Sequence, residues 1–167
     1  MVNSQTERFS AGLAGANEVP PINSTGTAAF EMTISDTITF SLTFSGLSSN
    51  LVVSHLHFAP SKVAGGVMIF LCGGGNQPAC PAATSGTITG TITAANVTGP
   101  SNQGITAGDL TSALEAVRDG LSYANMHTTN FTGVRFAATS GEVQGTVMMA
   151  INLPNQARQL AHFLHSP

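Results

Sequence analysis

Residues 37–44 have the sequence Thr37-Ile38-Thr39-Phe40-Ser41-Leu42-Thr43-Phe44. Large apolar side chains occupy every second position, and small hydroxyl side chains occupy the positions between them. Successive side chains of a β-strand point to opposite faces, so this alternation predicts a strand with one buried and one solvated face. Residues 26–34 also have strand character, and Ser35-Asp36 between the two segments indicates a hairpin.

Similar short segments recur along the chain, separated by turn residues. Phe9, Ala11 and Leu13 alternate near the start. We expect further strands at residues 51–58, 66–71, 86–93, 121–128, 133–137 and 141–151. Eight or so short strands of this kind predict an all-β protein, which we assign to an antiparallel Greek-key β-sandwich.

Residues 105–120 depart from this pattern. Apolar side chains there follow the i, i+3, i+4, i+7 spacing of an amphipathic helix, at Leu110, Ala113, Leu114 and Val117. Asp109 can cap this helix and Gly120 stands just beyond its end. The predicted fold is therefore a β-sandwich with one short helix.

The composition excludes several classes of function. Charged residues make up 8% of the 167 residues, about a third of the usual share. With five Lys and Arg against eight Asp and Glu, the chain has no basic stripe for nucleic acid. No apolar run reaches the roughly 18 residues that a membrane span needs. Instead, 20 Thr and 16 Ser are typical of a secreted or surface domain, and the scarcity of acids argues against paired-carboxylate catalysis.

Two cysteines, Cys72 and Cys80, flank a segment rich in glycine and proline that can fold back on itself. We predict that they form a disulfide, which would stabilise the fold by about 2.5 kcal/mol and implies an oxidising compartment. A pair of metal thiolates is the alternative, but no further Cys or His stands nearby at metal-binding spacing. The first residues lack the apolar core of a signal peptide, so we expect that a signal was removed and that the protein is secreted, periplasmic or on the cell surface.

Three of the five histidines have a suggestive placement. On a strand over residues 51–58, His55 and His57 share one face, while Val52, Leu56 and Phe58 face the core. On a strand over residues 121–128 the same parity puts three polar side chains on one face, and these are Tyr123, Asn125 and His127. If the two strands are neighbours, three imidazoles converge.

Three imidazoles suit copper, with zinc as the alternative. We therefore predict a site formed by His55, His57 and His127, with Glu18, Tyr123 and Asn125 as supporting partners of the ligands. The competing interpretation is that the histidines are hydrogen-bonded structural residues. His162 and His165 could chelate an ion on a helical tail, but we interpret them as part of an exposed tail.

The ordered set of motifs resembles the CHRD (chordin-type) domain over residues 8–151. The matching segments are the opening Leu13-Ala14-Gly15-Ala16-Asn17-Glu18-Val19-Pro20-Pro21, the strand with His55-Leu56-His57, Gly65-Gly66-Val67, Gly90-Thr91-Ile92-Thr93, the helix at 109–120, the box Tyr123-Ala124-Asn125-Met126-His127-Thr128, and Gly141-Glu142-Val143. The resemblance implies an all-β fold in a secreted or surface protein. It divides the chain into an extension at 1–7, the domain at 8–153 and a tail at 154–167.

One departure from the family pattern lies near the end. Gln144 stands where the family usually has Arg, and Arg135 lies among extra residues before it. The histidine pattern is also similar in arrangement, though not in sequence, to the copper site of the superoxide dismutase fold. The sequence thus leaves open redox chemistry such as superoxide dismutation and copper storage or delivery. It also leaves open a metal-free cell-surface module, which would either bind protein or glycan or be purely structural. A protein partner or homo-oligomer also stays open.

Overall fold

The computed structural model describes residues 6–60, 62–132 and 143–149. The strands are β1 (Glu7–Ala14), β2 (Thr27–Ile34), β3 (Ile38–Ser45), β4 (Leu51–Phe58), β5 (Gly66–Cys72), β6 (Gly86–Ile92), β7 (Ser122–Thr128), β8 (Val143–Thr146) and β9 (Met148–Met149). Among these residues there is one α-helix, α1 (Leu110–Arg118), and short 3-10 turns at η1 (Gly15–Asn17), η2 (Ala94–Asn96) and η3 (Ser101–Gln103). The all-β prediction with one short helix is confirmed.

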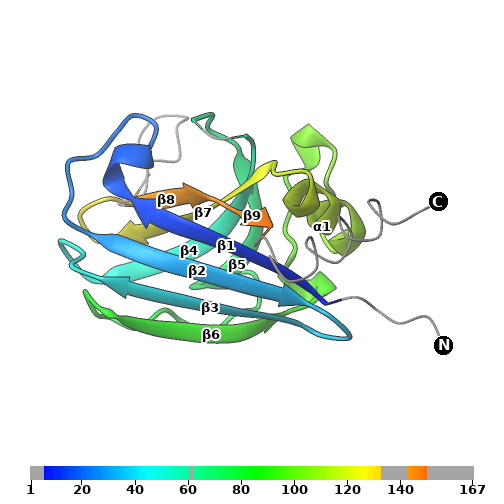
Figure 1. Ribbon diagram of the computed structural model, residues 1–167, viewed down its shortest axis with the longest axis horizontal. Coiled ribbons are helices and arrows are strands. Elements are labelled where there is room, and N and C mark those ends of the chain that lie inside the picture. The colour runs from blue at the N-terminus through cyan, green and yellow to red at the C-terminus, as the bar shows by residue number, and fades with distance from the viewer. Residues whose placement is uncertain (1–5, 61, 133–142, 150–167) are drawn as a thin grey trace, which may run out of the picture.

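The strands form one curved antiparallel sheet. Its order is β5-β4-β7-β8-β1-β2-β3-β6, and β9 pairs with β1. The sheet bends over on itself, so that β1, β2, β3 and β6 lie in front of β4, β5 and β7 in Figure 1. A bridge between Ile69 of β5 and Val97, just after η2, joins the two ends of the sheet. The result is a nearly closed, sandwich-like barrel.

The alternation that predicted β3 also determines its burial. Ile38, Phe40, Leu42 and Phe44 are all at most 8% exposed, because they point between the two layers. The hairpin with β2 is present, with Ile34 opposite Ile38, and it brings the rings of Phe30 and Phe40 to a centroid distance of 6.5 Å. Burial of these large apolar side chains is the main stabilising contribution of the front layer.

Most of the back layer is buried on both of its faces. Leu56, Ala124 and Met126 are fully buried and complete the apolar core, while every residue of β7 is buried. The other face of β4 and β7 carries the histidines, so it forms a second, polar interior layer. One prediction here is wrong: Val52 is 44% exposed and does not face the core. The pairing of β4 with β7 shifts register between Leu51 and Val53, and Leu51 is the buried residue instead.

Helix α1 begins later than the sequence predicts. The Asp109 side chain accepts a hydrogen bond from the Ser112 N–H at 3.1 Å, which confirms the cap. Residues before it form a turn, closed by the Asp109 N–H donating to the Thr106 carbonyl at 3.0 Å, so residues 105–109 are not helical. Gly120 has the left-handed φ of +70° that suits a residue after a helix end.

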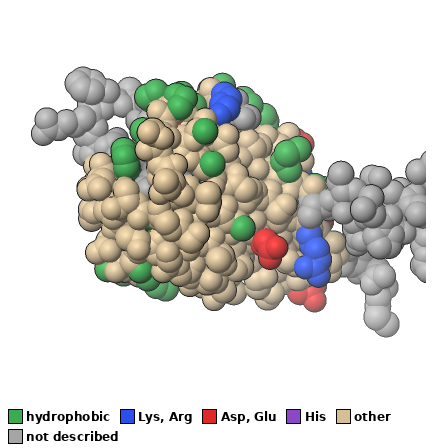
Figure 2. Space-filling model, turned by 60° about the vertical axis from the view of Figure 1, so that its left-hand side comes forward, with side chains coloured by type: hydrophobic (Ala, Val, Ile, Leu, Met, Phe, Trp, Pro, Cys, Tyr) green, Lys and Arg blue, Asp and Glu red, His purple; other side chains and the backbone are tan. Residues whose placement is uncertain are grey.

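Some predicted segments lie outside the described residues, namely the strand at 133–137, the ends of that at 141–151, and the tail at 154–167. Within the described part of the chain, no helix is long and apolar enough to cross a membrane. The face shown in Figure 2 carries few charged side chains, and no histidine is visible among the described side chains there. This matches the low charge of the sequence and the burial of the histidine face.

Candidate metal centre

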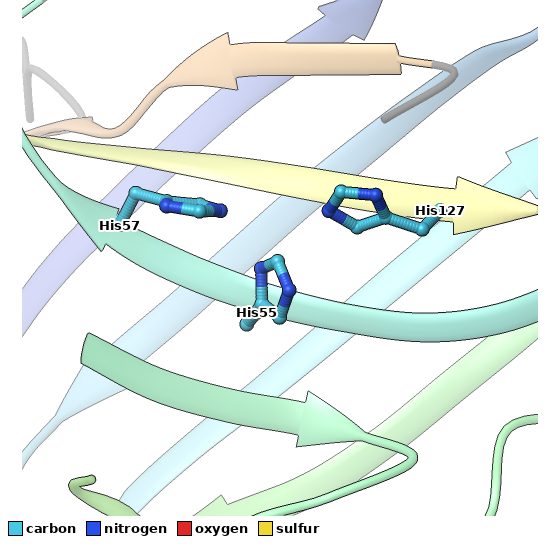
Figure 3. Close-up of side chains that lie close together, drawn as sticks. All are labelled: His55, His57 and His127. Carbon is cyan, nitrogen blue, oxygen red and sulfur yellow. The ribbon is translucent and has the colours of Figure 1, made fainter. Parts of the chain in front are cut away.

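The structure brings the three singled-out histidines together. Each offers a ring nitrogen, and these nitrogens lie within 4.8 Å of one another. His55 and His57 project from one face of β4, and His127 projects from the neighbouring β7 toward the same space (Figure 3). The cluster forms because β4 and β7 are antiparallel neighbours. The alternation of side chains along each strand predicted which face the histidines share, but it could not predict that these two strands pair.

The partner of His57 decides which of its nitrogens carries the proton. Its Nδ1 lies 2.8 Å from the carbonyl oxygen of Gly65. A carbonyl only accepts hydrogen bonds, so Nδ1 is the donor and the neutral ring leaves a lone pair on Nε2. That Nε2 atom is buried, with no hydrogen-bond partner among the described residues. It is therefore available as a metal ligand.

The other two rings have the same feature. Nδ1 of His55 and both ring nitrogens of His127 are buried, again with no hydrogen-bond partner in the described part of the chain. A buried polar atom without a partner costs about 1–3 kcal/mol. Three such rings side by side would be costly as purely structural residues, and one ion shared between them would supply the missing partner.

Burial keeps the three imidazoles neutral. Removal from water lowers the pKa of His57 to about 4 and that of His127 to about 4. Burial, followed by the neighbouring rings of His57 and His127, lowers the pKa of His55 well below its ordinary value. At neutral pH the rings therefore present lone pairs, as metal binding requires.

The donor set fits a first-row transition metal. Nitrogens bound at about 2.0–2.1 Å to a common ion stand roughly 3.3 Å apart, so the clustered nitrogens, which lie within 4.8 Å of one another, would move closer together around a shared ion. The cluster consists of imidazoles alone, with no carboxylate or thiolate. Neutral imidazoles are suitable ligands for copper and zinc, whereas magnesium and calcium prefer oxygen.

Aromatic packing fixes the orientation of the rings. The ring of Tyr123 stacks on His57 with centroids 4.7 Å apart and an angle of 6° between the planes. The Tyr123 hydroxyl accepts a hydrogen bond from the Gly65 N–H at 3.2 Å, so Gly65 holds both members of the stack. The ring of Phe70 on β5 packs edge-on against the ring of His55, with centroids 5.3 Å apart. The sequence placed Gly65 in a family motif but gave no sign of its contact with His57, and it did not single out Phe70, because a carbonyl contact and a cross-strand neighbour depend on the fold.

A polar network lies beside the cluster. Asn125, directly opposite His55 in the β4–β7 pairing, donates to Glu18 at 3.4 Å and to Gln144 at 3.2 Å. Glu18 is only 1% exposed, and Gln144 donates in turn to the Asn17 carbonyl. These bonds tie β7 to β8 and to the segment around η1. That Glu18, Tyr123 and Asn125 support a bound ion stays a prediction.

The disulfide between Cys72 and Cys80 is present, which confirms that prediction. It closes a loop in which the Gly73 N–H donates to the Pro78 carbonyl at 2.8 Å. Gly74 and Gly75 in this loop lie so close to the Phe70 ring that a Cβ on either would come within 2.8 Å of it. The disulfide loop therefore covers Phe70, which in turn packs on His55. His162, His165 and Arg135 lie outside the described residues.

Comparison with known families gives one result. The model of the CHRD domain matches residues 9–147, a span that includes all three clustered histidines and the disulfide. Comparisons with curated proteins and with solved structures found no match. The site must therefore be interpreted from its own chemistry.

Proposed function

The chain belongs to the CHRD domain family, and from the three converging imidazoles within that domain we propose that it binds a copper ion. His55, His57 and His127 are the proposed ligands, with Nε2 as the ligand atom of His57. The observation that carries the proposal is the set of buried ring nitrogens with no hydrogen-bond partner among the described residues. Zinc is the alternative ion.

Two arguments favour copper over zinc. Sites of nitrogen ligands bind Cu²⁺ more tightly than the other divalent first-row ions. The disulfide between Cys72 and Cys80 indicates an oxidising compartment, where Cu²⁺ is the stable state. On the same ground we propose that the protein works outside the cytoplasm, in the periplasm, at the cell surface or after secretion.

The burial of the site bears on what the ion does there. The three rings are between 0% and 5% exposed, so a bound ion would lie below the surface. Copper supplies one-electron redox chemistry when a substrate can reach it. Burial of the ligands hinders such access and favours tight retention, so we assign the protein to copper binding, for storage or delivery, rather than to turnover of superoxide.

The test is a competition titration of metal-free protein with Cu²⁺ and Zn²⁺ in the presence of a chelator of known affinity. The wild type should bind one Cu²⁺ per chain, more tightly than Zn²⁺. His57→Gln and His127→Gln should each weaken copper binding at least about 100-fold. Loss of a hydrogen bond that only supports a ligand weakens metal binding by up to about 100-fold, so loss of a ligand itself should cost at least as much.

A double variant, His162→Ala with His165→Ala, is the matched control because it removes the two other histidines of the chain and leaves His55, His57 and His127 in place. It should bind copper as the wild type does. Equal affinity in the wild type, His57→Gln and His127→Gln would overturn the proposal. The histidines would then be structural, and a surface module that binds protein or glycan would become the leading account.

A further inference from the structure

A small pocket lies beside the histidine cluster and is distinct from it. It has a volume of about 60 Å³ and is lined by Asn17, Lys62, Tyr123, Gln144, Gly145 and Thr146. The three imidazoles are not part of its lining, but Tyr123 belongs to both features, because its ring also stacks on His57.

The walls of the pocket come from four separate segments: η1, the loop after β4, and strands β7 and β8. Two hydrogen bonds between η1 and β8 hold two of these walls together. Asn17 Nδ2 donates to the Gln144 carbonyl at 3.2 Å, and Gln144 Nε2 donates to the Asn17 carbonyl. The pocket is therefore preformed and does not need a ligand to assemble it.

Lys62 gives the pocket its charge. It is the one lysine of the chain, and its Nζ donates to the Ala16 carbonyl at 3.1 Å and to Asn17 Oδ1 at 3.2 Å. Both acceptors are uncharged, so they orient the ammonium group without neutralising it. An ammonium group has three N–H donors, so on this exposed side chain one donor remains for solvent or a ligand.

The volume limits the ligand to a very small molecule. One water needs about 10–15 Å³ of space measured in this way, so the pocket holds the equivalent of roughly four waters. That suits a ligand of three or four non-hydrogen atoms, whereas a whole sugar or nucleotide would not fit inside it. The lining is polar and its one charged side chain is Lys62.

We propose that this pocket binds a small oxyanion of the carboxylate or bicarbonate type, with Lys62 as its charged partner. The amide groups of Asn17 and Gln144 and the hydroxyl group of Thr146 give the pocket its polar walls. This proposal is independent of metal binding, because the pocket is complete without an ion in the histidine cluster. It can therefore be tested in metal-free protein.

The experiment follows backbone amide resonances of Gly145 and Thr146 while metal-free protein is titrated with acetate at constant ionic strength. Acetamide, which has nearly the same shape without the charge, is titrated in parallel. Acetate should give saturable shifts and acetamide should not. Lys62→Gln should weaken acetate binding about tenfold or more, as expected for loss of one charge-assisted hydrogen bond.

Two variants control this result. Lys62→Arg keeps the charge and should retain acetate binding, whereas Arg8→Gln removes an exposed cation on β1, outside the pocket lining, and should leave binding unchanged. If Lys62→Gln does not fold, Thr146→Val, which leaves Lys62 in place, should weaken acetate binding severalfold. Equal shifts with acetamide, equal affinity in a folded Lys62→Gln, or no saturable shift with acetate would overturn the proposal.

Discussion

The carbonyl oxygen of Gly65 lies 2.8 Å from Nδ1 of His57, and this contact fixes the proton of the imidazole on the nitrogen that faces away from the cluster. The lone pair of His57 Nε2 is therefore the one available to bind an ion. A backbone atom in the loop before β5 therefore determines the chemistry of a side chain on β4. In metal sites, a hydrogen bond to the other ring nitrogen of a histidine ligand orients the ring and raises its basicity.

Replacing Gly65 should damage both the loop and the site. A Cβ at this position would collide with the Phe58 carbonyl oxygen and would come within 2.7 Å of the Ala59 Cβ. We expect Gly65→Ala to lower the free energy of unfolding by about 1–3 kcal/mol and to weaken copper binding roughly 10- to 100-fold, as measured by urea unfolding and by copper titration.

Gly12→Ala is the matched control, since a Cβ there meets nothing within 4 Å. It should change the free energy of unfolding by less than about 0.5 kcal/mol and leave copper affinity unaltered. Wild-type copper affinity in folded Gly65→Ala would show that the Gly65 carbonyl does not prepare His57 for binding.

The disulfide should contribute measurably to stability. Cys72 and Cys80 are eight residues apart, and closing a loop of that length reduces the entropy of the unfolded chain by an amount worth about 2.5 kcal/mol. The double variant Cys72→Ala with Cys80→Ala should lose about that much in urea unfolding. Reductant should destabilise the wild type and leave the variant unchanged; a wild type insensitive to complete reduction contradicts this.

The fold was predictable where the signal is local. The alternation from Ile38 to Phe44 specifies a half-buried strand whatever its neighbours, and Asp109 specifies a cap within its own turn. Val52 was misplaced because a register shift in the β4–β7 pairing reverses its face, and strand parity assumes regular pairing. The alternation along the strands also could not predict that the histidine face is buried, because segments distant in sequence cover it.

The candidate site was likewise predictable only where the signal is local. Parity placed His55 with His57 on one face because two residues of one strand suffice for that inference. The approach of His127 needed β4 beside β7, which the pattern could only assume. Gly65 stands in a family motif, but its role at the site could not be predicted, because that role comes from a carbonyl group that every residue has.

The stability of the metal-free protein should depend on pH through the buried imidazoles. Burial lowers the pKa of His57 and of His127 to about 4, whereas both rings take up protons near pH 6.5 when the chain is unfolded. The unfolded state then binds more protons between these values. The free energy of unfolding should therefore be constant above about pH 6.5 and fall on acidification toward pH 4, by up to about 1.4 kcal/mol per pH unit for each buried histidine.

Urea unfolding of metal-free protein at pH 7.5, 6.0 and 5.0 measures this dependence. The His162→Ala, His165→Ala variant should reproduce the slope, and His127→Gln should reduce it, because one of the buried imidazoles is gone. A free energy of unfolding that does not change between pH 7.5 and 5.0 would mean that the cluster is not closed to water in solution.

The central claim, that His55, His57 and His127 together hold one copper ion, is tested most directly by electron paramagnetic resonance of protein loaded with one equivalent of Cu²⁺. The wild type and the His162→Ala, His165→Ala variant should show the same nitrogen hyperfine pattern from imidazole ligands. His55→Gln, His57→Gln and His127→Gln should each change that pattern, with fewer coupled nitrogens. A wild-type spectrum that persists in all three cluster variants, and is lost in the tail variant, would place the copper elsewhere and contradict the account.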